Sequence, residues 1–363
     1  TTGMISHAVR KAGRMFLRRF PRLRWNARKV YWGIQRRRYD REAAKMPIDT
    51  HRVFFESFGG RSICDSPKAL LLAMLRDHKY DEYSFVLSLS HPDEKQDVLD
   101  GVFGDDMSRI DFKELMRCGT IIINTRLPEY VYPRTGNSIV DVNGTPCDMQ
   151  VKQTYVSCWH GTPLKRLGYD VDICMHNTFN TTAELAWRFG IDSEKWTYLL
   201  SPSAYTTEHL CSAFGLPREK WDDVVLEVGY PRNDAISTDG EWNAGELAKR
   251  RDAAAKRLRD IYGIELPSDK KVLLYAPTWR DDLYVDGKGH VLDESMLLDF
   301  GEVLHELGDE WCILFRGHYY VADDFDFSRY GSQVIDASKV DDVNDCYLVA
   351  DALCTDYSSV FYD

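Results

Sequence analysis

Five short polar segments stand directly after predicted buried strands and contain the residue types that bind phosphate. Histidine, arginine and hydroxyl side chains recur in them, and each segment follows an apolar run. The segments are Trp159–Lys165, Gly229–Asp234, Ala276–Asp281, Arg316–His318 and Thr355–Ser359. Because ligands of open α/β sheets bind beyond the carboxyl ends of the strands, these segments are candidates for a single site.

The first segment combines a titratable base with backbone that a ligand can approach. His160 follows the predicted strand Tyr155–Cys158, and Gly161 leaves room beside the chain. We expect Thr162 to cap a helix beginning at Pro163, which would point N–H groups toward an anion. A single histidine is often structural, but the position at a strand end favours a functional role.

The other four segments add cations and hydroxyl groups. Arg232 offers a planar guanidinium to phosphate, and Arg316 with His318 puts a cation and an imidazole at another strand end. Thr278 and Ser358–Ser359 supply hydroxyl donors, the latter at the start of a predicted helix. Each segment alone also fits a simpler role, such as a turn, a core histidine or an N-cap. Together they indicate a diphosphate-bearing ligand held across a cleft.

Short apolar runs alternate with helical segments over most of the chain. The alternation begins at Val53–Ser57 and resumes at Val272–Tyr275, after a long predicted helix at Gly245–Tyr262. This pattern favours parallel sheets covered on both faces. We therefore predict an α/β protein with two Rossmann-type domains, residues 49–240 and 241–363, joined by that helix and facing a central cleft.

A basic segment precedes the first domain. Residues 1–45 contain 14 Lys and Arg against 2 Asp and Glu, whereas the rest of the chain contains 32 against 55. Phe16 and Phe20 share one face of a predicted helix, and Pro21 is expected to begin a second piece. A basic helical segment over residues 1–48 fits an anionic membrane surface. The alternatives are a solvated face, packing on a partner, or nucleic acid, which the acidic body disfavours.

Composition argues against several other classes. The 9 cysteines are scattered without a Cys-x-x-Cys pair, which is typical of reduced thiols and not of a secreted disulfide scaffold. We recognise no signal peptide, and the longest apolar run, Ala69–Leu75, is too short to span a bilayer. The sequence also lacks a Walker P-loop, a Gly-x-Gly-x-x-Gly fingerprint and a convincing metal-ligand set. Any membrane contact is therefore expected to be peripheral.

In order and spacing, the five segments resemble the motifs of the CDP-glycerol glycerophosphotransferase family, the teichoic-acid primases and polymerases. The similarity spans about 200 residues and extends to Phe54–Ser57 and Asp65–Lys68 in the first domain. The resemblance implies a GT-B-like architecture, a CDP-glycerol or CDP-ribitol donor, release of CMP, and no catalytic metal or other cofactor. It also implies a lipid-linked polymer as acceptor and a location at the cytoplasmic face of the cell membrane.

Carried over by position, the resemblance assigns a donor site and a base. It makes His160 and His318 the catalytic residues, and we expect His160 to be the general base. The donor-binding residues are Gly161, Thr162, Pro163, Leu164, Arg232, Pro277, Thr278, Arg316, Gly317, Ser358, Ser359 and Asp363. Gly317 replaces a larger residue often found in that triplet. Similar proteins continue beyond the position of Asp363, so we expect a second domain that is truncated here.

Two other functions are compatible with the same residues. One is a glycosyltransferase of the same architecture that uses a nucleotide sugar. The other is a nucleotide- or phosphopolymer-binding module without catalysis. Nucleotide release from CDP-, UDP- and GDP-linked donors would separate the first from the phosphotransferase, and donor binding without turnover would identify the second.

Overall fold

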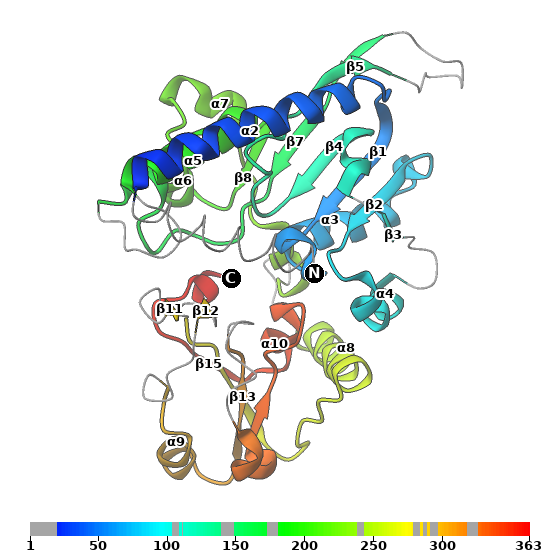
Figure 1. The fold of residues 1–363 in the computed structure, drawn as a ribbon. Coiled ribbons are helices and arrows are strands. Elements are labelled where there is room, and N and C mark those ends of the chain that lie inside the picture. Colours follow the sequence, from blue (N-terminus) through cyan, green and yellow to red (C-terminus); the bar gives the residue numbers. More distant parts are fainter. Residues whose placement is uncertain are drawn as a thin grey trace, which may run out of the picture.

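The computed structural model of the chain contains two parallel sheets, each flanked by helices. One sheet lies above the other in Figure 1, and the C-terminus lies between them. The residues that the structure describes are 20–103, 109–110, 112–138, 149–172, 181–237, 243–278, 284–285, 289–290, 297–317 and 326–363.

The first sheet consists of seven parallel strands from the N-terminal part of the chain. They are β1 (Asp49–Glu56), β2 (Ser84–Ser88), β3 (Arg109–Ile110), β4 (Cys118–Ile123), β7 (Thr154–Ser157), β8 (Tyr198–Ser201) and β9 (Val225–Glu227). Their spatial order is β3-β2-β1-β4-β7-β8-β9. Because β1 and β4 lie in the interior of the sheet, the chain that follows each of them emerges near its middle.

Alternation along the central strands divides their apolar side chains between two hydrophobic clusters. Phe54 and Ile121 join Tyr155 in one cluster, whereas Phe55 and Ile122 belong to the cluster on the other face. Burial on both faces is the pattern expected of a parallel sheet. The first cluster is covered by α2 (Pro21–Ala43), α5 (Thr182–Lys195) and α6 (Ala204–Ala213), and the second by α3 (Asp65–Arg76) and α4 (Gln96–Phe103).

The second sheet consists of four parallel strands from the C-terminal part. They are β10 (Lys271–Tyr275), β13 (Trp311–Phe315), β14 (Val334–Asp336) and β15 (Ala352–Cys354), in the order β14-β13-β10-β15. Leu274 and Leu314 face one hydrophobic cluster, and Tyr275 and Phe315 face the other. The first is covered by α8 (Ala244–Tyr262) and α10 (Val343–Val349), and the second by α9 (Phe300–Leu307).

Smaller elements lie outside the two main sheets. A single helical turn, α7 (Trp221–Val224), precedes β9. Two antiparallel ladders pair β5 (Thr135–Asn137) with β6 (Gln150–Lys152), and β11 (Tyr284–Val285) with β12 (Gly289–His290).

Helix α8 connects the two sheet units, as the sequence predicts. The Asn243 side chain accepts a hydrogen bond from the Glu246 N–H and caps the start of the helix. Gly263, with φ of 67°, ends it in the left-handed conformation that glycine adopts without strain. Tyr262 packs against hydrophobic clusters of both units, so this helix fixes part of their contact.

Ion pairs also join the facing edges of the two units. The Lys68 Nζ of α3 lies 2.7 Å from the Asp342 Oδ2, and these side chains are only 13% and 11% exposed. Lys95 pairs with Asp341, whose other oxygen accepts a hydrogen bond from the Ile63 N–H at 3.1 Å. Each of these three contacts joins residues that are more than two hundred positions apart in the chain, so the contact is a tertiary one.

The described part of the basic segment is one helix, α2, and one of its faces packs on its own unit. It begins at Pro21, as predicted. Trp25 and Trp32 contact Trp187 of α5, with ring centroids 4.8 and 5.4 Å apart. The sequence suggested packing only on an external partner, so this internal packing is a new finding. The predicted helical face at Phe16 lies outside the described residues.

Candidate functional site

Loops from the two sheet units meet beside His160. Gly161 follows β7 in the first unit, and Ser359 follows β15 in the second. A Cβ atom added at Gly161 would lie 2.7 Å from the Ser359 Oγ and 3.2 Å from its Cβ. The backbone of the segment that contains Gly161 therefore touches the Ser359 side chain where the two sheet units meet. Only glycine leaves room for this approach.

A second contact between the two units adds a third predicted segment, the one that follows β10. The Lys165 Nζ lies 3.5 Å from the Thr278 Oγ1 and 4.6 Å from the centroid of the Tyr357 ring. The Thr278 N–H donates to the Asp356 Oδ1 at 2.9 Å, so the segments after β10 and β15 are hydrogen-bonded to each other. Pro277 is half-buried in the same loop.

The His160 imidazole has a defined tautomer. Its Nδ1 lies 2.7 Å from the Asn124 carbonyl oxygen, which can only accept a hydrogen bond. Nδ1 therefore carries the proton in the neutral ring, and Nε2 is left with a lone pair that can accept one. The ring lies beside the aromatic rings of Phe58 and Trp159, with centroids 5.6 and 4.2 Å away.

The surroundings of His160 lower the pKa of its imidazole. The main cause is desolvation by the protein around the ring, which disfavours the imidazolium. The Asn124 carbonyl and the Asp65 carboxylate oppose this and raise the pKa, whereas Arg232 and Arg126 add to the lowering. The residue as a whole is nevertheless exposed, so a solute can reach it. A neutral, accessible imidazole is suited to accept a proton near neutral pH.

The helix predicted to begin at Pro163 does not form, and this expectation is wrong. The Pro163 carbonyl accepts a hydrogen bond from the Tyr205 hydroxyl at 3.2 Å, where a helix would need the N–H of Leu167. Thr162 is buried, and its Oγ1 lies 3.4 Å from the hydroxyl oxygens of Tyr230 and Thr206. No helix N-terminus therefore points at His160 from this segment.

Arg232 and Asp363 are brought together, and both are engaged with other side chains. Arg232 is 4% exposed, and its Nη2 lies 2.6 Å from the Asp363 Oδ1. Its Nη1 donates to the Asp65 Oδ1 at 3.1 Å, and its guanidinium lies over the Tyr230 ring. Burial raises the pKa of Asp363, although Arg232 opposes the shift. These contacts make Arg232 a link between the two units.

The remaining predicted donor residues cluster at the ends of β13 and β15. The Arg316 Nη1 donates to the Ala337 carbonyl at 3.2 Å, and the Gly317 N–H donates to the Ser338 Oγ at 2.9 Å. Ser358 caps a short 3-10 turn at Ser359–Tyr362, where the sequence predicted a longer helix. His318 lies outside the described residues.

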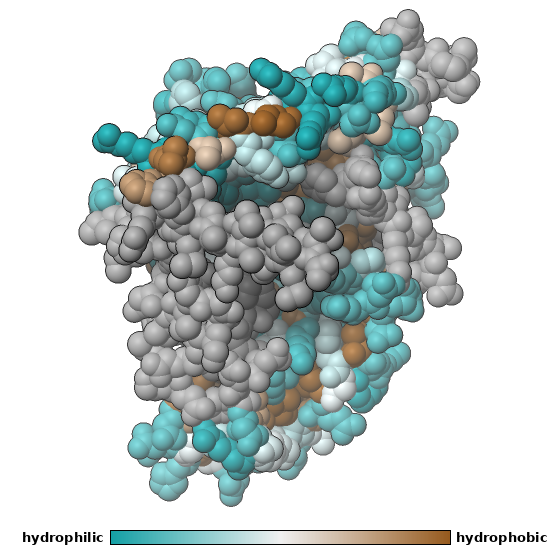
Figure 2. Space-filling model, in the orientation of Figure 1, coloured by the Kyte–Doolittle hydropathy of each residue, from teal (hydrophilic) through white to brown (hydrophobic). Residues whose placement is uncertain are grey.

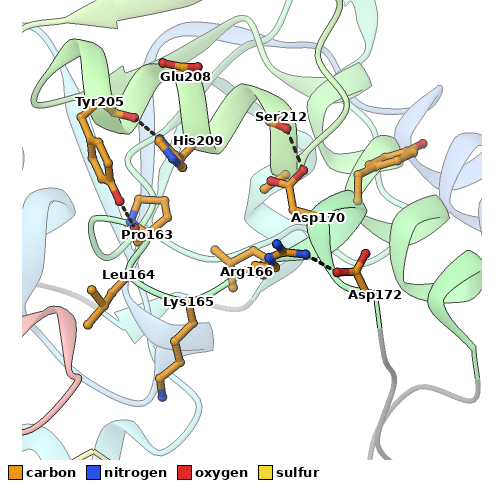
Figure 3. Close-up of a pocket in the computed structure, with 13 residues that line it drawn as sticks. Pro163, Leu164, Lys165, Arg166, Asp170, Asp172, Tyr205, Glu208, His209 and Ser212 are labelled. Carbon is orange, nitrogen blue, oxygen red and sulfur yellow. Dashed lines mark hydrogen bonds and ion pairs between the residues drawn. The ribbon is translucent and has the colours of Figure 1, made fainter.

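A groove opens beside the His160 loop on the first unit. It lies between residues 163–172 and α6 and encloses about 640 Å³ (Figure 3). Tyr205 and His209 of α6 line one side and Arg166 lies along the other, whereas the Lys165 side chain points away from α6. Arg166 pairs with Asp172 at the far end. Leu164, a predicted donor residue, lies at the near end and is exposed. An elongated polar ligand could lie in this groove.

Two residues of the site, Asp65 and Asn124, were given no role from the sequence. Asn124 follows β4 directly, so the rule that ligands bind beyond strand ends would have found it. Asp65 lies at the start of α3 and looks like an ordinary first-turn acid in the sequence. Only the fold reveals that both contact the surroundings of His160.

The fold and the site define a class: an α/β protein of two parallel sheets whose strand-end loops converge on a histidine. Residues 39–363 match the family of CDP-glycerol:poly(glycerophosphate) glycerophosphotransferases, and the chain belongs to this family.

Curated relatives of the chain are enzymes of teichoic acid synthesis. The chain is 34% identical over 335 residues to the teichoic acid poly(glycerol phosphate) polymerase of Staphylococcus epidermidis, a match that covers 91% of this chain and 41% of the relative. It is 33% identical over 328 residues to the teichoic acid glycerol-phosphate transferase of Staphylococcus aureus, covering 88% of this chain and 72% of the relative. The chain thus spans well under half of the first relative's length.

A solved structure of the wall teichoic acid polymerase TagF has a similar fold. The TM-score is 0.69 at 31% sequence identity, and the match covers 96% of this chain and 76% of the other. A variant of that polymerase soaked with CDPG gives the same TM-score and identity. The mixed α/β architecture with parallel sheets is therefore similar to that of this polymerase.

Proposed function

We propose that the chain transfers glycerol-phosphate, or ribitol-phosphate, from a CDP-activated donor to a hydroxyl of a lipid-linked teichoic-acid-like or capsular polymer and releases CMP. Family membership supports the reaction class, and the relatives' names supply the polymer class. In this proposal the architecture is GT-B-like, with residues 49–240 on the acceptor side and residues 241–363 on the donor side.

The observation that carries the proposal is the contact of Gly161 with Ser359 next to His160. It joins a base on the first sheet unit to a hydroxyl cluster on the second. A transferase needs both groups within reach of one substrate, because orientation of the reactants supplies much of the rate enhancement. A module that only binds nucleotide has no need for a base with this tautomer.

The step that we assign to these residues is an in-line displacement at phosphorus. The acceptor oxygen attacks the β-phosphorus of the donor, and the bond from that phosphorus to the bridging oxygen breaks. The hydroxyl proton passes to the His160 Nε2, and CMP leaves with the bridging oxygen. Arg316, Thr278, Ser358 and Ser359 hold the diphosphate and the charge that develops on it. His318 stays a predicted second catalytic residue.

We place the acceptor chain in the groove of Figure 3. The groove is lined from Pro163 onward, three positions after His160 in the chain, and on this ground we place its near end beside the base. Tyrosine rings can stack on the carbon chain of a polyol, and Lys165 can pair with phosphate. A polymer end that enters along α6 would present its terminal hydroxyl to the imidazole.

Helix α2 supports a peripheral position on an anionic membrane. Its outward face exposes apolar side chains between basic ones, and Figure 2 shows them as brown patches along the helix. The exposed apolar residues are Phe20, Leu23, Val30, Tyr31 and Ile34. No helix in the described part of the chain combines the length and the apolar composition that crossing a bilayer needs. A basic helix with such a stripe can lie in the interface.

A nucleotide-release assay tests the proposed function. CDP-glycerol, CDP-ribitol and a UDP-linked sugar are supplied with a lipid-linked glycerol-phosphate acceptor, and released nucleotide is measured. We expect CMP from a CDP-polyol and no UDP. His160→Gln, which keeps a polar side chain, should lower the rate by at least about 100-fold, because a positioned general base contributes that much.

His78→Gln is the matched control for that variant. His78 is a highly exposed histidine of the first unit that contacts the carboxylate of the nearby Asp81, so its replacement should leave the rate unchanged. UDP release with no CMP release would instead favour a glycosyltransferase. Tight donor binding with no turnover would favour a binding module.

A further inference from the structure

The asparagine that bonds to the histidine has its own side chain hydrogen-bonded at both ends. Asn124 is completely buried, and its carbonyl accepts the bond from the His160 Nδ1. The Asn124 Oδ1 accepts from the Phe58 N–H at 2.8 Å, and its Nδ2 donates to the Asp65 Oδ2 at 2.8 Å. An amide with both ends bonded in a buried position has one orientation, so the carbonyl beside His160 is fixed as well.

Asp65 connects the Asn124 amide, through Arg232, to the second unit. It is 8% exposed, and its Oδ1 accepts from the Arg232 Nη1 at 3.1 Å. Arg232 in turn reaches Asp363, the described residue that follows the 3-10 turn of the second unit. A buried carboxylate needs such a partner, because an unpaired charge at that depth is strongly destabilising. The chain of contacts therefore runs from the donor side to the imidazole.

Backbone strain is concentrated around the same histidine. Among the described residues, only three that are not glycine have positive φ: Phe58 at 49°, Asp65 at 64° and Trp159 at 47°. Phe58 and Trp159 flank the imidazole, and Asp65 holds Asn124. Such conformations are costly for bulky side chains and persist only where surrounding contacts enforce them, which is common at functional sites.

We propose that Asp65 and Asn124 are positioning residues for the transfer reaction: they hold His160 as the Nδ1–H tautomer, with Nε2 directed to the acceptor hydroxyl, and Arg232 links them to Asp363 on the donor side. The inference about the reaction rests on the proposed function, whereas the tautomer is a property of the protein alone. Neither residue touches a reacting atom, so both act through His160.

The charges around the imidazole give the proposal a measurable signature. Asp65 raises the pKa of His160, whereas desolvation, Arg232 and Arg126 lower it. Replacing Asp65 by Asn removes the negative charge and leaves the two arginines. The pKa of His160 should then fall further. A rate that requires neutral His160 declines as pH falls through this pKa, so the acid limb of the pH–rate profile should move to lower pH.

The first measurement is an ¹⁵N NMR titration of the full chain with labelled histidine. The His160 signals are identified by their loss in His160→Gln. In the wild type we expect the neutral ring to show a protonated Nδ1 and an unprotonated Nε2. In Asp65→Asn we expect a lower pKa and partial loss of the single tautomer. Asparagine tolerates positive φ nearly as well as aspartate, so the backbone at this position is preserved.

The second measurement is the pH–rate profile of CMP release. Asp65→Asn should reduce the plateau rate by about 10- to 100-fold, as expected for a displaced catalytic group, and shift the acid limb to lower pH. Asp351→Asn is the matched control, because it removes a carboxylate that pairs with Arg251 in the second unit. It should change stability without moving the His160 titration. Glycine also adopts positive φ without strain, so Asp65→Gly is the variant to measure if Asp65→Asn does not fold.

The two measurements separate failure of the inference from failure of the proposed function. An Nε2–H tautomer in the wild type, or an unchanged His160 titration in both Asp65 variants, would overturn the positioning role. The expected titration together with no CMP release from either CDP-polyol would leave the positioning role supported and would reject the transfer reaction.

Discussion

At the scale of single residues, Gly161 is a position where the two sheet units touch next to His160 in the chain. A methyl group there would lie 2.7 Å from the Ser359 Oγ, nearer than unbonded atoms approach. We expect Gly161→Ala to push the Ser358–Ser359 turn away and raise the KM for the CDP-polyol by about tenfold, since a small misplacement of a binding group is costly. Steady-state kinetics with varied donor would measure this.

Gly245→Ala is the control for the glycine substitution. Gly245 lies in the first turn of α8, where an added Cβ would meet only the Asn243 Oδ1, at 3.5 Å. Alanine favours helix more than glycine does, so this variant should be slightly more stable and equally active. An unchanged KM in Gly161→Ala would show that the contact with Ser359 has no part in donor binding.

Individual residues of the site were predictable where the signal was local. His160 and Ser359 were predicted because each follows an apolar strand run, and that rule depends on neighbours in the sequence. The partners of Arg232 were not predictable, because Asp65 and Asp363 lie 167 and 131 positions away. The expected phosphate contact of Arg232 remains a prediction, and its described partners are carboxylates.

At the scale of elements, the strands were predicted well and the polar turns less well. Strands such as β4 and β13 are continuous apolar runs, which a sheet buried on both faces requires. The helix expected at Pro163 failed because a tyrosine from α6 takes the carbonyl that the helix needs. That competitor lies 42 positions further along the chain, so local capping signals could not reveal it.

Helix α2 has two apolar faces, and each accounts for a different contact. Trp25 and Trp32 are used against α5, which leaves the outward stripe to be explained. We expect the chain to co-sediment with vesicles that contain phosphatidylglycerol and to dissociate as salt increases. Val30→Asp with Ile34→Asp should weaken this binding by roughly 10- to 100-fold, from the apolar area lost to the interface.

Leu75→Asp provides the comparison for the α2 variant. Leu75 is also an exposed apolar residue, but it lies near the end of α3. The same charge placed there should leave vesicle binding unchanged. Equal loss of binding in both variants would indicate a general effect of negative charge and would contradict a specific role for α2.

At the scale of the whole molecule, activity in our proposal depends on how the two units are held together. Helix α8 packs on both, Arg232 reaches Asp363, and Lys68 reaches Asp342. The base belongs to the first unit and the hydroxyl cluster to the second. Any change that separates the units should therefore reduce transfer even when both sheets remain folded.

The pair of Lys68 and Asp342 tests this dependence directly. Lys68→Ala leaves a nearly buried carboxylate without its cation, and loss of one partner from such a pair costs about 3 kcal/mol. We expect a lower midpoint in urea unfolding and a larger radius in small-angle scattering, with CMP release reduced in proportion to the open fraction. Adding Asp342→Asn should restore part of the stability, because the asparagine can still cap α10 and no charge is left unpaired.

Lys271→Ala shows whether the effect belongs to the junction. Lys271 pairs with Glu310 on the surface of the second unit, where both side chains are more than half exposed. Its loss should cost less than about 1 kcal/mol and leave the radius and the rate unchanged. If Lys68→Ala behaves like Lys271→Ala in all three measurements, the ion pair does not hold the units together. The alignment of His160 with Ser359 would then depend on the other contacts between the units, such as α8, Arg232 and the pair of Lys95 and Asp341.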